Sequence, residues 1–164
     1  MSPARAQEFT TDVDASVRQC FVTVTDFERY PSWFSAVERT KVLDRYPNGL
    51  AKQVEYRVDM KLKSIRYVLE YEYAKPTRLT WRSVGGDLES IEGSYLFEKV
   101  GPKLTRATCR QAVSIGFWVP GPIRTVMERQ ALKQSVLEFK AAAERAATEQ
   151  TTQRALGHRR SSKR

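Results

Sequence analysis

Apolar and polar residues alternate with a period of two through the middle of the chain. The clearest runs are Val54 to Met60 and Ile65 to Tyr73, in which every second residue is apolar. This spacing is typical of a β-strand with one buried face. The alternation predicts five strands in succession, over residues 50–60, 64–73, 79–83, 91–97 and 105–117.

The connections between these strands are short and rich in turn-forming residues. They contain Asn48-Gly49, Pro76, Gly85-Gly86 and Gly101-Pro102, which favour tight turns. Consecutive strands joined by short turns indicate an antiparallel meander, because parallel neighbours need long crossovers. A short strand over 6–12 and an extended segment over 37–43 bring the expected number to about seven.

Two short helical segments are expected after the first strand. Asp14 is a plausible N-cap for a helix whose apolar residues are Val17, Cys20, Phe21 and Val24. Pro31 disfavours the α conformation at Tyr30 and predicts a break there. A second short helix would then carry Trp33 and Phe34.

A long helix is predicted over 122–149, which is rich in helix-forming residues and has no internal glycine or proline after Pro122. At 100° per residue it has two apolar sectors, which indicates contact from two sides. One sector holds Ile123, Val126, Met127, Leu137 and Ala141, with Gln130 and Gln134 inside it, and the other holds Leu132, Val136, Phe139 and Ala143.

These elements predict an α+β fold in which a curved antiparallel sheet of about seven strands wraps around the C-terminal helix, with two short helices after strand one. The helix would cover the apolar face of the sheet. The inner row is strongly aromatic, with Tyr56, Tyr67, Tyr71, Trp81, Tyr95 and Phe97. Two interpretations stay open: these rings fill a solid core, or they line a cavity with a few polar hydroxyl groups.

The order of elements and two motifs resemble a known family. The motifs are Asp26-Phe27-Glu28-Arg29-Tyr30-Pro31-Ser32-Trp33, and Gly93-Ser94-Tyr95-Leu96-Phe97-Glu98 followed by Thr105-Arg106-Ala107-Thr108. Over residues 5–147 the chain resembles the START-like helix-grip superfamily, within it the polyketide cyclase/dehydrase and coenzyme Q-binding branch. The resemblance implies a deep cavity between sheet and C-terminal helix that holds a hydrophobic small molecule. It also implies either a carrier of lipids, quinones or polyketides, or a polyketide aromatase/cyclase that needs no cofactor.

The length of 164 residues is that of one domain. The formal net charge is +9, and five positive charges, Arg154, Arg159, Arg160, Lys163 and Arg164, lie within residues 153–164, where there is no acid. The pattern predicts a ligand-binding domain over 5–147 and a disordered basic tail over 148–164. The tail has three interpretations: solvated disorder, attraction to an anionic membrane surface, or weak nucleic-acid contact. No aromatic residue is interleaved with its charges, so we expect no specific nucleic-acid recognition.

Several function classes are excluded by residue counts. The one histidine, His158, lies in the tail, which excludes a histidine-based zinc site or a Ser-His-Asp triad in the body. Cys20 and Cys109 cannot form a disulfide framework, and they indicate a reducing compartment, most simply the cytoplasm. No apolar run has the length of a membrane span, and the N-terminus lacks the apolar region of a secretion signal. We expect no cofactor and no metal, and the sequence makes no prediction of oligomeric state.

Eleven residues are candidates for ligand contact: Tyr56, Tyr67, Tyr71, Trp81, Tyr95, Phe97, Cys109, Gln111, Met127, Gln130 and Gln134. Gln111, Gln130 and Gln134 would form a neutral polar patch if all three faced one space, and such a patch suits an oxygenated apolar ligand. Arg66, Arg82 and Arg110 fall on the outer face, and Glu89 is the one acid that would share the inner face. Without a clear inward acid or base, we expect a binding protein more than an enzyme; the alternative is a cofactor-independent polyketide cyclase or aromatase.

Overall fold

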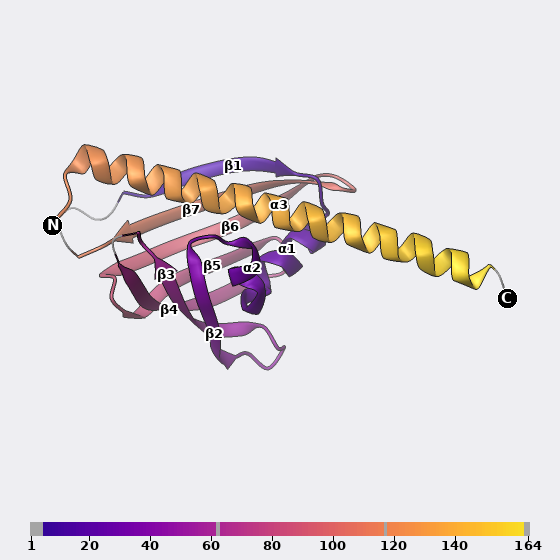
Figure 1. Cartoon of the computed structure of the whole chain (residues 1–164), viewed down its shortest axis with the longest axis horizontal. Helices are drawn as coiled ribbons and strands as arrows, with labels where there is room; N and C mark the ends of the chain where they lie inside the picture. The colour runs from indigo at the N-terminus through magenta and orange to yellow at the C-terminus, as the bar shows by residue number, and fades with distance from the viewer. Residues whose placement is uncertain (1–4, 62, 117, 163–164) are drawn as a thin grey trace.

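The computed structural model describes residues 5–61, 63–116 and 118–162 (Figure 1). Seven strands form one antiparallel sheet in the order β1-β7-β6-β5-β4-β3-β2. The strands are β1 (Gln7–Val13), β2 (Val37–Arg45), β3 (Ala51–Asp59), β4 (Ser64–Ala74), β5 (Arg78–Gly86), β6 (Ser90–Gly101) and β7 (Leu104–Ser114). The helices are α1 (Val17–Thr25), a 3₁₀ turn η1 (Phe27–Arg29), α2 (Tyr30–Trp33) and the long α3 (Gly121–Ser161).

The sheet confirms the predicted meander. Each strand from β2 to β6 pairs with the next one along the chain, and β1 completes the order by pairing with β7. The period-two pattern places the predicted apolar rows on one face, where Val54, Tyr56 and Val58 of β3 are buried. Phe117, which the pattern includes in the last strand, lies outside the described residues.

The entry to the first helices differs from the prediction in two details. The N-cap of α1 is Ser16, whose side chain accepts a hydrogen bond from the backbone N–H of Gln19. The N–H of Asp14 instead donates to Glu144 of α3, so Asp14 belongs to the connection before the helix. Tyr30 adopts the α conformation although Pro31 follows it. Pro31 itself is tolerated because it occupies the first turn of α2, where no N–H is needed.

Helix α3 lies along β1 and packs its middle part into the core (Figure 1). Leu132, Val136, Phe139 and Ala143 are buried against the sheet and the short helices. These residues recur at steps of three and four, so they form one face of the helix. The other predicted apolar sector lies on a different face and is exposed at Ile123, Val126, Met127 and Leu137.

The structure describes residues 148–161 as helix, where the sequence predicts a disordered tail over 148–164. Helix α3 continues to Ser161, and every side chain from Thr148 to Ser162 is exposed. The segment projects past the sheet at the yellow end of Figure 1. Its alanine, glutamine and arginine residues favour a helix locally, and a helix needs no apolar periodicity to continue from an anchored preceding turn.

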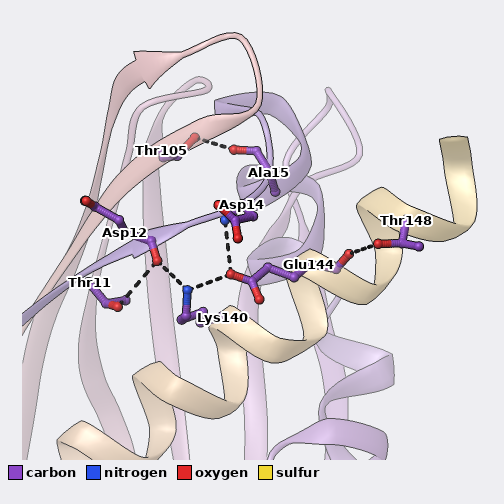
Figure 2. Close-up of polar contacts among 8 residues, drawn as sticks. All are labelled: Thr11, Asp12, Asp14, Ala15, Thr105, Lys140, Glu144 and Thr148. Atoms are coloured by element: carbon purple, nitrogen blue, oxygen red, sulfur yellow. Dashed lines mark hydrogen bonds and ion pairs between the residues drawn. The ribbon is translucent and has the colours of Figure 1, made fainter.

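Polar contacts fasten α3 to the end of β1 (Figure 2). The ammonium group of Lys140 donates to the carbonyl oxygen of Asp12 and to Oε1 of Glu144, both at 2.6 Å. The same Glu144 oxygen accepts from the N–H of Asp14 at 3.1 Å. These contacts, which we call the α3 clamp (Asp12, Asp14, Lys140 and Glu144), hold the helix at its middle.

Candidate ligand-binding face

The inner face of the sheet carries a continuous set of aromatic rings. Tyr56 of β3 stacks on Tyr67 of β4 with centroids 5.4 Å apart, and Trp81 lies 6.1 Å from Tyr71 and 5.9 Å from Tyr95. The alternation of each strand directs these side chains to one side. Eight predicted residues therefore share this face: Tyr56, Tyr67, Tyr71, Trp81, Tyr95, Phe97, Cys109 and Gln111.

One end of the aromatic face is solid core. The ring of Phe139 on α3 lies 5.2 Å from Tyr95 and 5.8 Å from Phe97. Phe97 and Cys109 are buried there. The packing is looser at Gln111 and Val113 of β7, which are only half-buried, and Val113 contacts Arg124 in the first turns of α3. Tyr67 of β4 is half-buried as well.

The most specific polar feature of the face joins three strands. Trp81 of β5, Gly93 of β6 and Gln111 of β7 are cross-strand neighbours in one row. The indole N–H of Trp81 donates to Oε1 of Gln111 at 3.2 Å. The ring passes over Gly93, where an added Cβ atom would lie 2.4 Å from Cε2 of Trp81. Gly93 is therefore required for the Trp81–Gln111 contact.

The hydroxyl and thiol groups of the inner face stay protonated near neutral pH. Burial raises the pKa of Tyr56, Tyr67, Tyr71 and Tyr95 above the usual tyrosine range. Burial also raises the pKa of the Cys109 thiol to about 12 and that of Cys20 to about 11. A protonated thiol is a poor nucleophile, so both cysteines behave as small buried hydrophobic residues.

The three predicted residues of α3, Met127, Gln130 and Gln134, do not lie on the inner face of the sheet. The structure therefore does not bring Gln130 and Gln134 together with Gln111. Met127 is 53% exposed, and Gln130 and Gln134 are exposed as well. The amide of Gln134 donates to the hydroxyl of Ser35 and to Glu138. The sequence offered two apolar sectors of similar strength, and the one with the large Phe139 side chain is the one that packs on the sheet.

The structure adds two residues that the sequence analysis missed. Arg124 donates to the carbonyl oxygen of Val113 on β7 at 3.1 Å, and its Nε atom pairs with Glu128 at 2.9 Å. Both side chains are partly buried. Steps of four from Leu132 and Val136 lead back to Glu128 and Arg124, so the helical spacing contained this signal. Glu89, in contrast, is exposed and accepts from Ser114, which corrects its predicted inward position.

Two concavities that are lined by described residues lie on the outer face of the sheet and not between the sheet and the helix. The larger has a volume of about 120 Å³ and is lined by Arg39, Thr40, Lys41, Glu55, Arg57 and Arg66. The other, of about 100 Å³, lies around Glu70 and Arg82 on the outer face of the sheet. The cavity that the resemblance implies therefore stays a prediction.

The chain belongs to the polyketide cyclase/dehydrase and lipid transport family, whose model matches residues 13–140. Among solved structures, it is similar to a START superfamily protein from Mycobacterium smegmatis, with 23% identity, a TM-score of 0.74, and coverage of 88% of this chain and 97% of that one. A protein from Thermus thermophilus has 16% identity and a TM-score of 0.75, and the match covers 87% of this chain and 99% of that one.

The Zhui aromatase/cyclase from Streptomyces sp. R1128 is also similar, with 14% identity and a TM-score of 0.73 over 86% of this chain and 94% of that one. At these identities the likeness shows the helix-grip START fold. None of the curated proteins compared with the chain matches it. In the part of the chain that is described, no helix is both long and apolar enough to cross a bilayer.

Proposed function

We propose that the protein binds a hydrophobic small molecule, such as a lipid, quinone or polyketide, on the inner face of the sheet beneath the first turns of α3. The observation that carries the proposal is the Trp81–Gln111 pair, with the half-buried Val113 two residues after Gln111 on the same face of β7. An apolar surface with one polar pair is the usual composition of a small-molecule site. Membership of the family supports the same ligand class.

The packing of α3 supports a route to this face. From Gly121 to Ala131 no side chain of the helix is fully buried, whereas burial begins at Leu132. The α3 clamp at Lys140 and Glu144 holds the later turns. A ligand can therefore displace the first turns at a small loss of buried apolar area, since the hydrophobic gain scales with that area. The Arg124–Val113 contact would open with this movement.

The polar groups of the face are suited to orient a ligand. Oε1 of Gln111 is occupied by Trp81, and its amide NH₂ makes no hydrogen bond to any described residue. That NH₂ group would donate to a carbonyl or hydroxyl oxygen of the ligand. Tyrosines that stay protonated near neutral pH donate hydrogen bonds but are poor proton acceptors. This chemistry favours binding, with cyclisation of a poly-β-ketone as the alternative activity.

Quenching of Trp81 by a decyl-substituted benzoquinone tests the proposal. The double variant Trp33→Phe, Trp118→Phe retains Trp81 alone, and we expect saturable quenching because a ligand on the inner face touches this ring. The matched control, Trp33→Phe with Trp81→Phe, retains Trp118, which is 85% exposed. In that control we expect only weak, non-saturating quenching. Equal quenching in both variants would show that the quinone does not bind at the inner face.

The Gln111→Leu variant separates binding from catalysis. It removes the amide, so affinity should fall for the quinone and rise for an alkane-tailed probe that lacks carbonyl groups. Incubation with a poly-β-ketone provides the second measurement. The protein would be a cyclase and not a carrier if it closes the ring in a pH-dependent way, if Gln111→Leu retains this activity, and if Tyr67→Phe loses it.

A further inference from the structure

Charged residues on the outer face of the sheet follow a regular pairing rule. Arg106 of β7 lies between Asp12 of β1 and Glu98 of β6 in the strand register. Arg82 of β5 likewise lies between Glu70 of β4 and Glu92 of β6. The Arg106–Asp12 and Arg82–Glu70 ion pairs are both 3.1 Å long. Opposite charges across strands stabilise a sheet, and like charges directly opposite destabilise it.

One row breaks this rule. Arg39 of β2 lies opposite Arg57 of β3, and Arg57 lies opposite Arg66 of β4. Three arginines therefore stand in line across three adjacent strands. Lys41 adds a fourth cation, since it follows Arg39 on the same face of β2 and lies opposite Glu55. We call Arg39, Lys41, Arg57 and Arg66 the basic row.

The basic row has one acid for four cations. Glu55 accepts from Nε of Arg66 at 2.9 Å and pairs with its terminal nitrogen at 2.7 Å, so that guanidinium is held in place. The side chains of Arg39, Lys41 and Arg57 form no ion pair or hydrogen bond with any described residue. These four cations and Glu55 line, with Thr40, the concavity of about 120 Å³ described above. The concavity opens on the face opposite the aromatic rings, because Glu55 and Arg57 alternate with the inward Tyr56.

We propose that the basic row is a binding site for a phosphate group, carried by a soluble phosphate compound or by a lipid headgroup. Guanidinium groups form paired hydrogen bonds to phosphate oxygens, and a phosphate monoester carries a charge of about −1.5 to −2 near neutral pH. Such an anion would neutralise the cations that lack a protein partner. The site is separate from the proposed ligand-binding face and does not depend on it.

Two measurements test this site, each with inorganic phosphate and with chloride at the same ionic strength. Calorimetry measures the Kd for the anion, and thermal unfolding measures the unfolding temperature. The Arg57→Gln variant removes the central cation, and we expect the Kd for phosphate to rise about tenfold or more. The same variant should unfold at a higher temperature than the wild type in phosphate-free buffer, because it removes like-charge repulsion. Arg106→Gln is the matched control; it should lower the unfolding temperature and leave the phosphate affinity unchanged.

Arg39→Gln, on the edge strand, provides a second variant and should weaken phosphate binding as well. Vesicles of phosphatidylcholine with and without phosphatidic acid distinguish the two sources. If Arg57→Gln no longer binds the phosphatidic acid vesicles and Arg106→Gln still does, the site binds a lipid headgroup. If both variants bind the vesicles equally but Arg57→Gln has lost the binding of inorganic phosphate, the site binds a soluble phosphate compound. The proposal is overturned if phosphate gives the same binding heat and the same unfolding temperature as chloride. It is also overturned if Arg57→Gln and Arg106→Gln bind phosphate equally well.

Discussion

At the scale of single residues, the position of Trp81 requires that residue 93 be a glycine, because the indole ring occupies the space that a side chain would take. The indole passes over this glycine and reaches Gln111 on the next strand. The same residue lies in one of the motifs that carry the family resemblance, Gly93-Ser94-Tyr95. A glycine inside a strand often marks a close approach of another group, and here the group is the ring that we propose as part of the binding face.

Gly93→Ala should destabilise the protein by about 1–3 kcal/mol, because the new methyl group overlaps the indole. Urea unfolding followed by circular dichroism measures the loss. Gly85→Ala on β5 is the matched control, since an added Cβ atom there meets nothing within 4 Å. Its free energy of unfolding should change by less than about 0.5 kcal/mol. Similar losses in the two variants would contradict the role given to Gly93.

At the scale of elements, α3 has three parts with different roles. Residues 121–131 are loosely packed, residues 132–143 are inserted in the core, and residues 148–161 project into solvent. The α3 clamp sits where the second part ends (Figure 2). A helix held at its middle can shift its first turns without unfolding its buried part, and the proposed access route depends on this division.

The α3 clamp predicts a specific response to acid. Burial raises the pKa of Glu144, but hydrogen bonds from Lys140 and the N–H of Asp14 outweigh it, so the net pKa is lowered. A carboxyl group with a lowered pKa stabilises the fold above its unfolded pKa of about 4.3. This contribution is lost as the pH falls through the folded pKa.

Glu144→Gln should therefore cost about 1 kcal/mol at pH 7 and less at pH 3, where the wild-type carboxylate is increasingly protonated. Unfolding measured from pH 7 to pH 3 checks both values. Glu149→Gln, further along the exposed part of α3, is the control and should behave like the wild type. A Glu144→Gln loss that stays constant with pH would rule out the ion pair as its cause.

At the scale of the whole molecule, charge is distributed unevenly. Five of the positive charges lie in residues 153–164, so the remaining body carries 9 − 5 = +4. Within the described part of this segment, Arg154, Arg159 and Arg160 lie on an exposed projecting helix (Figure 1). Each basic residue near an anionic bilayer contributes about 1 kcal/mol of attraction, which salt weakens. We propose weak contact of this segment with anionic membranes.

Deletion of residues 150–164 should leave the unfolding temperature unchanged, because none of the described side chains removed is buried. It should reduce co-sedimentation with phosphatidylglycerol vesicles at low salt, with the difference vanishing at high salt. The triple variant Arg154→Gln, Arg159→Gln, Arg160→Gln keeps the helix and should lose most of the same binding. If the truncated and full-length proteins bind these vesicles equally, the projecting helix has no membrane role.

Local chemistry was enough to predict the order of elements. Strand alternation, turn residues and helix-forming composition act over a few residues, so they placed seven strands and the long helix close to their observed bounds, apart from the continuation of α3 to Ser161. The inward direction of Tyr56, Tyr71 and Trp81 followed from the same alternation. The family resemblance of residues 5–147 rested on these elements and on short motifs, and the family match over residues 13–140 confirms it.

Other features depend on how distant segments meet. The chain alone presented two apolar sectors on α3, and only packing against the sheet selected Leu132, Val136 and Phe139 over Met127 and its neighbours. The Trp81–Gln111 contact joins residues 30 positions apart in the chain. The basic row arises from the pairing of β2, β3 and β4, and β2 contains register shifts that alternation cannot predict. Local patterns determine which element a residue joins, whereas register and packing across the sheet determine which residues become neighbours.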